Sequence, residues 1–245
     1  MADWIAHARI ADEVLKRIPW LDCRGFSVGS IAPDCNVENE DWTSFTPPRE
    51  MTHFMRGKDK SLEDAGRFLN EYINGRVFSS QGEKSFLLGY YAHLVTDVMY
   101  QNHVRDEARV RDVWKRILED KSLKEKAGNV PRTWANAKAL FPKERRLLEQ
   151  HSLEAEYLSK HPQSGFLTEI LPMKTMETYL DFLPGEYIIR KIGVMAKVPD
   201  PEKKPEKYYT ITKEEYDKFL SETIAYLQKV FSQISMDLKE TAEPL

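Results

Sequence analysis

The chain has 245 residues, of which 41% are apolar and 31% are charged, and its formal net charge is −3. This length is enough for one large domain or two small ones with a sizeable core. The slightly acidic balance offers no basic stripe of the kind that follows a nucleic-acid backbone, which excludes double-stranded DNA as an expected partner.

The start of the chain mixes acids and bases with apolar positions, so it lacks the uninterrupted apolar stretch of a signal peptide. No run approaches the roughly eighteen apolar residues of a membrane span. Cys23 and Cys35 are the only cysteines, and they do not form a close-spaced pair of the zinc-ribbon or redox type. We expect a soluble, cytoplasmic protein without a transmembrane segment.

Helical periodicity dominates, and β-rich runs with two-residue hairpin turns are nearly absent. The expected fold class is therefore all-α, a single multi-helix domain. In chain order, the pattern predicts helices over residues 3–18, 61–74, 81–104, 105–126, 131–140, 142–160, 165–181 and 212–240. Ser61 followed by Asp64, and Thr212 followed by Glu215, are N-terminal capping patterns.

Two stretches interrupt the helical pattern. Residues 19–60 contain four prolines and few periodic features, although the tryptophans at 20 and 42 favour an ordered segment. Residues 198–211 form a connector rich in proline and lysine before the last amphipathic helix. Because there are no repeats or low-complexity tracts, we expect one domain over residues 1–245.

The stretch from His93 to His103 places two of the chain's six histidines and an aspartate on one predicted helix. His93 and Asp97 lie about 40° apart around the helix axis and one turn along it, so both side chains can reach one cation. His103 lies about 120° around the axis from Asp97, which suits a second ion better than the same one. The alternative is a buried histidine hydrogen-bonded to an aspartate, without metal.

Three further histidines lie in apolar or helical settings. His7 falls on the apolar face of the first predicted helix, and His53 lies in the apolar segment MTHFM. His151 shares a helix face with Glu154, whereas Glu156 points about 140° away. Nitrogen and oxygen ligands in this combination suit zinc. For His7, a hydrogen-bonded core histidine is the alternative.

The order of these residues resembles the zinc-dependent phospholipase C family, whose all-helical fold is shared with the S1/P1-type nucleases. The resemblance lies in an early helix histidine, the segment GSIAPD, the histidine of THF, the His-x-x-x-Asp pair with a histidine six residues later, and a last histidine followed by a glutamate. It covers residues 4 to about 156.

The resemblance implies two or three zinc ions held by histidine and carboxylate ligands. The implied sets are His53, His93 and Asp97 for one ion; His103, His151 and a glutamate for a second; and His7 with the shared Asp97 for a third. Asp34 would be the acidic residue near the attacking water. A capping aspartate in a turn is the alternative for Asp34.

Two departures from the family pattern affect these ligands. Secreted members are matured so that an N-terminal tryptophan binds a metal through its amino nitrogen and carbonyl oxygen, whereas Trp4 follows three residues here. The family also has a glutamate four residues after the last histidine, where this chain has Ala155. Geometry favours Glu154 as the substitute ligand, with Glu156 as the alternative.

The leading hypothesis is therefore a zinc-dependent phosphoesterase that resembles phospholipase C and acts on phosphoesters, phospholipid head groups among them. The second hypothesis is a nuclease or phosphodiesterase for single strands, although the acidic charge counts against it. The third is a non-catalytic metal-binding or interaction module with the same fold. The sequence does not indicate an oligomeric state.

Overall fold

The computed structural model describes residues 2–240, with side chains described up to Ile234. The chain is all-α, as predicted, and its described part contains one short antiparallel hairpin, β1 (Val37–Glu38) with β2 (Phe45–Thr46). In this hairpin Val37 lies opposite Thr46. No helix in the described range is both long enough and apolar enough to cross a membrane.

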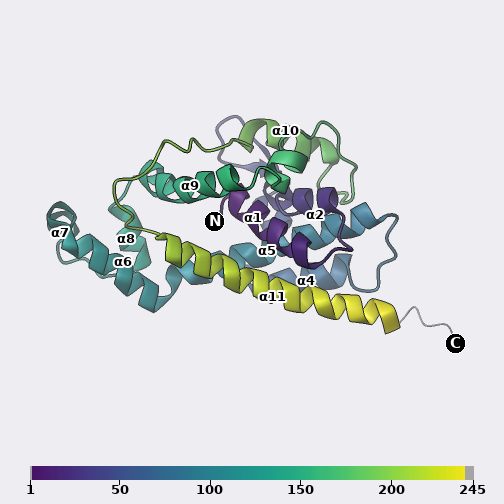
Figure 1. Ribbon diagram of the computed structural model, residues 1–245, viewed down its shortest axis with the longest axis horizontal. Coiled ribbons are helices and arrows are strands. Elements are labelled where there is room, and N and C mark those ends of the chain that lie inside the picture. Colours follow the sequence, from purple (N-terminus) through teal and green to yellow (C-terminus); the bar gives the residue numbers. More distant parts are fainter. Residues whose placement is uncertain (1, 241–245) are drawn as a thin grey trace. The chain divides into compact units, whose positions relative to one another are not determined.

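The helices follow one another along the chain as labelled in Figure 1. They are α1 (Trp4–Arg17), α2 (Cys23–Gly29), the 3-10 helix η1 (Ala32–Asp34), α3 (Arg49–Thr52), α4 (Leu62–Tyr72), α5 (Gln81–Arg105), α6 (Glu107–Glu119), α7 (Lys121–Ala127), α8 (Trp134–Ala139), α9 (Lys143–Lys160), the short π-helix η2 (Phe166–Ile170), α10 (Gly185–Met195) and α11 (Lys213–Glu240).

The chain divides into two compact units. The smaller unit comprises Met99–Pro162 and Lys197–Phe219, and the larger comprises Ala2–Val98, Gln163–Ala196 and the described residues from Leu220 on. The boundaries fall inside α5 and α11. The expectation of one domain over residues 1–245 stays a prediction.

Both predicted caps are confirmed. The Ser61 hydroxyl accepts a hydrogen bond from the backbone N–H of Asp64 at 3.1 Å and starts α4. At the start of α11, the Thr212 hydroxyl accepts from the N–H of Glu215, while the Glu215 carboxylate accepts from the N–H of Thr212. Each bond satisfies an N–H that the first helical turn leaves without an intrahelical partner, so these boundaries were readable from local sequence.

Two predicted helices are wrong. The helix expected over 105–126 is divided into α6 and α7, because the Asp120 carboxylate accepts from the N–H of Leu123 at 3.0 Å and begins a new helix. The helix expected over 165–181 is helical only at η2, since Pro172 supplies no N–H to continue it. The helix α10 begins instead after Pro184, which the sequence reading missed together with α2 and α3.

The smaller unit has its own apolar core. Helices α6, α7 and α8 lie together in it (Figure 1). Its buried residues are Val110, Val113, Trp114, Ile117, Ala127, Ala137, Leu140, Phe141 and Tyr209. The charged residues over 105–126 thus lie on a solvated outer face, and the apolar residues lie on an inner face that packs in this core.

In the larger unit, two glycines let α2 and α5 approach closely. A Cβ on Gly29 would lie 2.1 Å from the carbonyl oxygen of Phe86, and a Cβ on Gly89 would lie 2.3 Å from that of Phe26. Any side chain at either position would push the two helices apart. This contact brings the C-terminal end of α2, and with it Ser30, next to the middle of α5.

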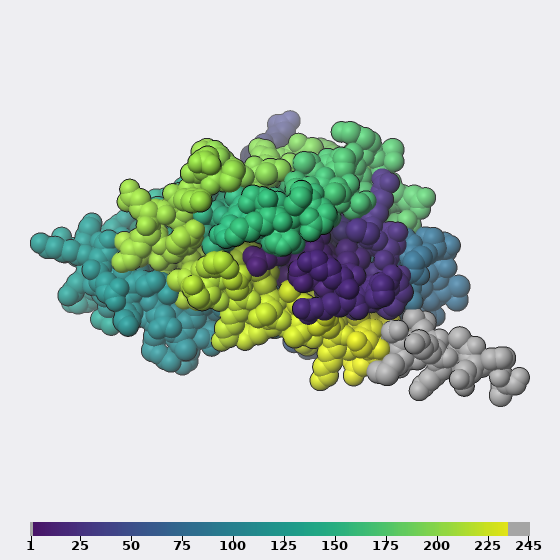
Figure 2. Space-filling view, in the orientation of Figure 1, coloured from purple at the N-terminus to yellow at the C-terminus, as the bar shows by residue number. Residues whose placement is uncertain are grey.

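The later part of α11 packs in the larger unit, as its amphipathic pattern predicts. The ring of Phe231 meets that of Phe26 edge-on, with centroids 5.8 Å apart. Figure 2 shows the yellow residues of this helix beside the purple residues of the N-terminal helices. Leu220, Ile224 and Leu227 are buried as well.

Candidate metal centre

The helix α5 positions two predicted ligands through its own periodicity. His93 and Asp97 are one turn apart and are 0% and 2% exposed. The Nε2 atom of His93 lies 3.5 Å from Oδ2 of Asp97. Both side chains therefore point from α5 into the interior of the larger unit.

A hydrogen bond assigns the tautomer of His93. Its Nδ1 is 2.8 Å from the carbonyl oxygen of Ser30, and a carbonyl can only accept, so Nδ1 carries the proton. Nε2 is then unprotonated, and its lone pair faces the carboxylate of Asp97. The close approach of α2 to α5 thus leaves His93 with a free nitrogen lone pair, as a metal ligand requires.

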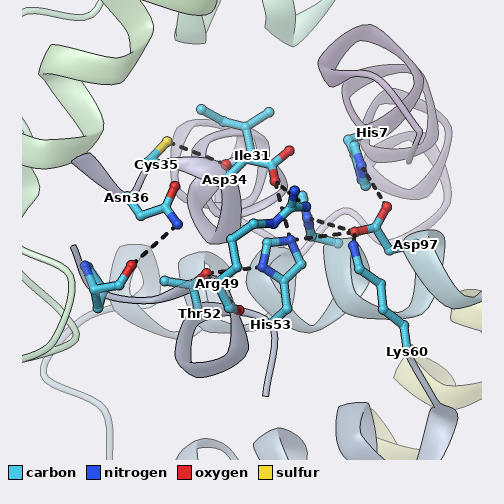
Figure 3. Close-up of polar contacts among 12 residues, drawn as sticks. His7, Ile31, Asp34, Cys35, Asn36, Arg49, Thr52, His53, Lys60 and Asp97 are labelled. Carbon is cyan, nitrogen blue, oxygen red and sulfur yellow. Dashed lines mark hydrogen bonds and ion pairs between the residues drawn. The ribbon is translucent and has the colours of Figure 1, made fainter. Parts of the chain in front are cut away.

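His7 comes from α1 and packs against His93. The two imidazole rings are stacked, with centroids 3.9 Å apart and planes 5° from parallel. The Nε2 atom of His7 is 3.9 Å from Oδ1 of Asp97, too far for a hydrogen bond (Figure 3). Within the described residues neither ring nitrogen of His7 has a hydrogen-bond partner, although the residue is 1% exposed. The hydrogen-bonded core histidine considered as the alternative does not describe this side chain.

His53 follows α3. Its Nδ1 lies 3.0 Å from the Thr52 hydroxyl, which also lies 3.3 Å from the carbonyl oxygen of Arg49. Tyr90 on α5 donates to the carbonyl of Thr52 at 2.5 Å and holds this turn in place. The Nε2 atom of His53 is directed at Asp97 Oδ2, 3.5 Å away.

The backbone turns sharply just after His53. Phe54 has a φ of 56°, a left-handed conformation that is uncommon for a bulky residue. Its ring packs edge-on against Phe68, Tyr72 and Phe182, with centroids 5.1 to 6.3 Å apart. This packing stabilises a strained turn that directs His53 towards α5.

Asp34 ends η1 on the more open side of the cluster, with a side chain that is 15% exposed. Its Oδ1 lies 3.3 Å from Nε2 of His53 and 3.8 Å from the guanidinium of Arg49 (Figure 3). The predicted turn at residues 32–34 is present, but the carboxylate faces the histidine cluster.

Two basic residues of this centre were missed by the sequence reading. Lys60, in the loop before α4, makes an ion pair through Nζ with Oδ2 of Asp97. Arg49, on α3, faces Asp34. No local spacing relates Lys60 to Asp97, 37 residues away, so only the folded chain reveals this pair.

Burial governs the protonation of the three imidazoles. It lowers the pKa of His7 to about 3, and it lowers the pKa values of His53 and His93 as well. All three are therefore neutral at pH 7, as metal-binding imidazoles must be.

The pKa values of the charged groups of the centre are shifted too. Burial by itself would raise the pKa of Asp34, but the neighbouring His53 and His93 outweigh it and hold that pKa well below the usual range. Burial lowers the pKa of Lys60 to about 7, against the opposing effect of the Asp34 charge. At neutral pH Asp34 is thus ionised.

The donor atoms fit zinc. They form two overlapping groups, each with all ligand atoms within 4.8 Å of one another: His7, His93 and Asp97, and Asp34, His53 and His93. Tetrahedral zinc with ligands at about 2.0 to 2.2 Å places those ligands about 3.3 to 3.6 Å from one another. The separations of Asp97 Oδ2 from His53 and His93, both 3.5 Å, match this spacing. A metal ion between these nitrogens and the carboxylate would supply the partner that each of them needs when buried.

The second predicted ligand set lies in the smaller unit. The Glu154 carboxylate is buried and accepts hydrogen bonds from Tyr216 at 2.8 Å and Gln150 at 3.1 Å. Glu156 instead pairs with Lys160 at 2.6 Å, near the surface. Glu154 is thus the inward-facing glutamate, as the helix geometry indicated.

His103 and His151 complete that predicted set. Burial lowers the pKa of His103 to about 4, and its ring lies 5.8 Å from that of Phe219. His151 is half-buried on α9. A ring nitrogen of His151 and a carboxylate oxygen of Glu154 lie within 4.8 Å of each other. The second set stays a prediction.

Comparison with known proteins supports zinc as the metal. The family model for zinc-dependent phospholipase C matches residues 6–153, which include every predicted histidine ligand and both aspartates. Neither the curated proteins nor the solved structures contain a significant match. Since the family model matches more than half of the chain, the chain belongs to the zinc-dependent phospholipase C family.

Proposed function

We propose that this protein hydrolyses phosphoesters with zinc bound in its larger unit. The convergence of three buried imidazoles on two carboxylates carries the proposal, because the Nε2 atoms of His7, His53 and His93 have no hydrogen-bond partner in the described structure. Family membership supports phospholipase C chemistry, and the mixed nitrogen and oxygen donors support zinc.

The two oxygens of Asp97 divide the proposed ligands into two sets. Oδ2 faces His53 and His93, which with Asp97 are the proposed ligands of one ion. Oδ1 faces His7, so a neighbouring ion would share Asp97 as a bridging ligand. His103, His151 and Glu154 are proposed for a further ion, which makes two or three in all.

Bound zinc ions acidify a water molecule and neutralise the phosphate oxygens. Asp34 is proposed to orient the attacking water by accepting its hydrogen bond, because its carboxylate is ionised and reaches the open side of the cluster. Arg49, with a side chain that is 34% exposed, lies beside Asp34 and can donate to a phosphate oxygen of the substrate.

The proposed substrate class is a phosphoester whose phosphate enters between Asp34 and Arg49. A phospholipid head group is the candidate that family membership favours. The experiment that tests the function counts zinc atoms per chain by elemental mass spectrometry. It then measures hydrolysis of bis-p-nitrophenyl phosphate, phosphatidylcholine and a short single-stranded oligonucleotide.

Zinc binding with hydrolysis of the first two substrates is the expected result. Cleavage of the oligonucleotide alone would favour a nuclease. Zinc without any hydrolysis would favour a binding module.

The role of Asp34 has its own test. Asp34→Asn keeps the size of the side chain but weakens its acceptor strength, so we expect kcat to fall about 10²- to 10⁴-fold with unchanged zinc content. Glu50→Gln, an exposed change next to Arg49 on the short helix α3, is the control and should leave both unchanged. A parallel loss of zinc in Asp34→Asn would make Asp34 a ligand instead.

A further inference from the structure

The side chain of Lys60 reaches the carboxylate at the centre of the histidine cluster. Its ammonium pairs with Oδ2 of Asp97, the same oxygen that faces Nε2 of His53 and Nε2 of His93. Figure 3 shows the Lys60 side chain extending from its loop to this carboxylate. The lysine side chain is 13% exposed and that of Asp97 is 1% exposed, so water screens the pair only weakly.

We propose that Lys60 is a built-in cation that competes with zinc for Asp97, so that zinc binding displaces the ammonium from the carboxylate. The inference rests on the proposed function only in taking Asp97 as a zinc ligand. It assigns to Lys60 control over zinc affinity, a role separate from any step of catalysis.

The competition follows from the chemistry of the shared oxygen. Zinc binds a carboxylate oxygen at about 2.0 to 2.2 Å, and an ammonium hydrogen-bonded to that oxygen occupies the same region. An ammonium has no lone pair, so it cannot act as a ligand alongside the metal. Two cations at such a short distance also repel each other.

The same pair stabilises the metal-free protein. A carboxylate as buried as Asp97 is costly without a compensating cation, and Lys60 supplies one. Lys60 therefore lowers the free energy of the metal-free state and raises that of the zinc-bound state. Both effects weaken zinc binding.

The loop around Lys60 allows the displacement. Lys60 immediately precedes Ser61, whose cap fixes the start of α4, so the backbone is anchored while the four-carbon side chain can rotate. The side chain is already partly exposed, and a path to solvent is therefore open without unfolding of the loop.

The test measures zinc affinity by competition with a chromogenic chelator at pH 7, together with the melting temperature of the metal-free protein. Lys60→Met keeps the apolar stem and removes the charge. We expect zinc to bind about ten- to a hundredfold more tightly to this variant, and the metal-free melting temperature to fall. Lys58→Met, an exposed change two residues away, is the matched control and should alter neither.

Lys60→Gln serves as a second neutral variant if Lys60→Met does not fold. It should likewise bind zinc more tightly and have a lower metal-free melting temperature. Unchanged or weaker zinc binding in the neutral variants overturns the proposal, because the loss of a lysine that anchors the site would lower zinc affinity and stability together. If the wild type binds zinc and hydrolyses phosphoesters in that case, the proposed function stands without this inference. If the variant binds zinc but the wild type does not, the inference stands and the proposed function fails. Failure of every variant to bind zinc overturns both.

Discussion

Two buried carboxylates, Glu149 in the smaller unit and Asp97 in the larger, are stabilised in different ways. Glu149 accepts hydrogen bonds from the backbone N–H groups of Tyr209, Thr210 and Ile211 at 3.0, 2.7 and 3.2 Å. The Thr210 hydroxyl adds a fourth at 2.6 Å. The carboxylate of Glu149 thus has its hydrogen bonds completed by its own chain, and it fixes the backbone of residues 209–211, which lead into α11.

Asp97 has a different set of neighbours. It pairs with Lys60 and faces imidazole nitrogens 3.5 to 3.9 Å away, beyond hydrogen-bond distance. The comparison shows that burial of an acidic residue does not by itself indicate a functional site. The distinguishing feature is whether the fold completes the hydrogen bonds of the carboxylate or leaves ligand atoms directed at a cation.

The largest expected effect comes from Asp97→Asn. The change removes a shared anionic ligand, so zinc content should fall by at least one atom per chain and phosphodiesterase activity by about 10³-fold. Elemental mass spectrometry and hydrolysis of bis-p-nitrophenyl phosphate check both. Retention of full zinc content and rate would show that Asp97 is not a bridging ligand.

Glu149→Gln should have the opposite profile. An amide in place of the carboxylate directs N–H donors at backbone N–H groups, so the free energy of unfolding should fall by about 2 to 4 kcal/mol. Zinc content of the folded variant should be unchanged. Urea unfolding measures the first and elemental analysis the second. Loss of zinc at wild-type stability would remove the contrast between the two carboxylates.

Acid should destabilise the metal-free protein through its imidazoles. Because the pKa of His7 is about 3 in the folded protein and near 6.5 in the unfolded chain, the unfolded state binds more protons between these values. Stability is therefore full well above pH 6.5 and decreases as the pH falls, by about 2 kcal/mol for His7 between pH 6.5 and 5.

Melting temperatures recorded across this pH range test the expectation. In His7→Leu the decrease should be shallower, since one of the three imidazoles is gone. An equally steep decrease would place the acid sensitivity elsewhere.

The smallest expected effect concerns the glutamate of the second predicted ligand set. Glu154→Gln keeps an oxygen but loses its charge, so the affinity of the second zinc ion should fall about tenfold. Glu156→Gln should leave it unchanged, because Glu156 pairs with Lys160 near the surface. Zinc titrations of the two variants, compared directly, distinguish the glutamates, and the reverse order would make Glu156 the ligand.

Local sequence patterns predicted part of the fold. The helices α1, α4, α5, α9 and α11 were visible because their apolar periodicity and caps are properties of neighbouring residues. The expected helix over 165–181 was wrong, and α10 was missed, because apolar residues near Pro172 and Pro184 are placed by packing and not by helical periodicity.

For the centre itself, the sequence alone determined the pairing of His93 with Asp97, since a separation of four residues fixes their common face on any α-helix. Resemblance in residue order added His7, Asp34 and His53. Only the tertiary structure decided that His7 stacks on His93 and that Lys60 reaches Asp97. These contacts join segments far apart in the chain, and their geometry depends on how closely the helices pack, which no local spacing specifies.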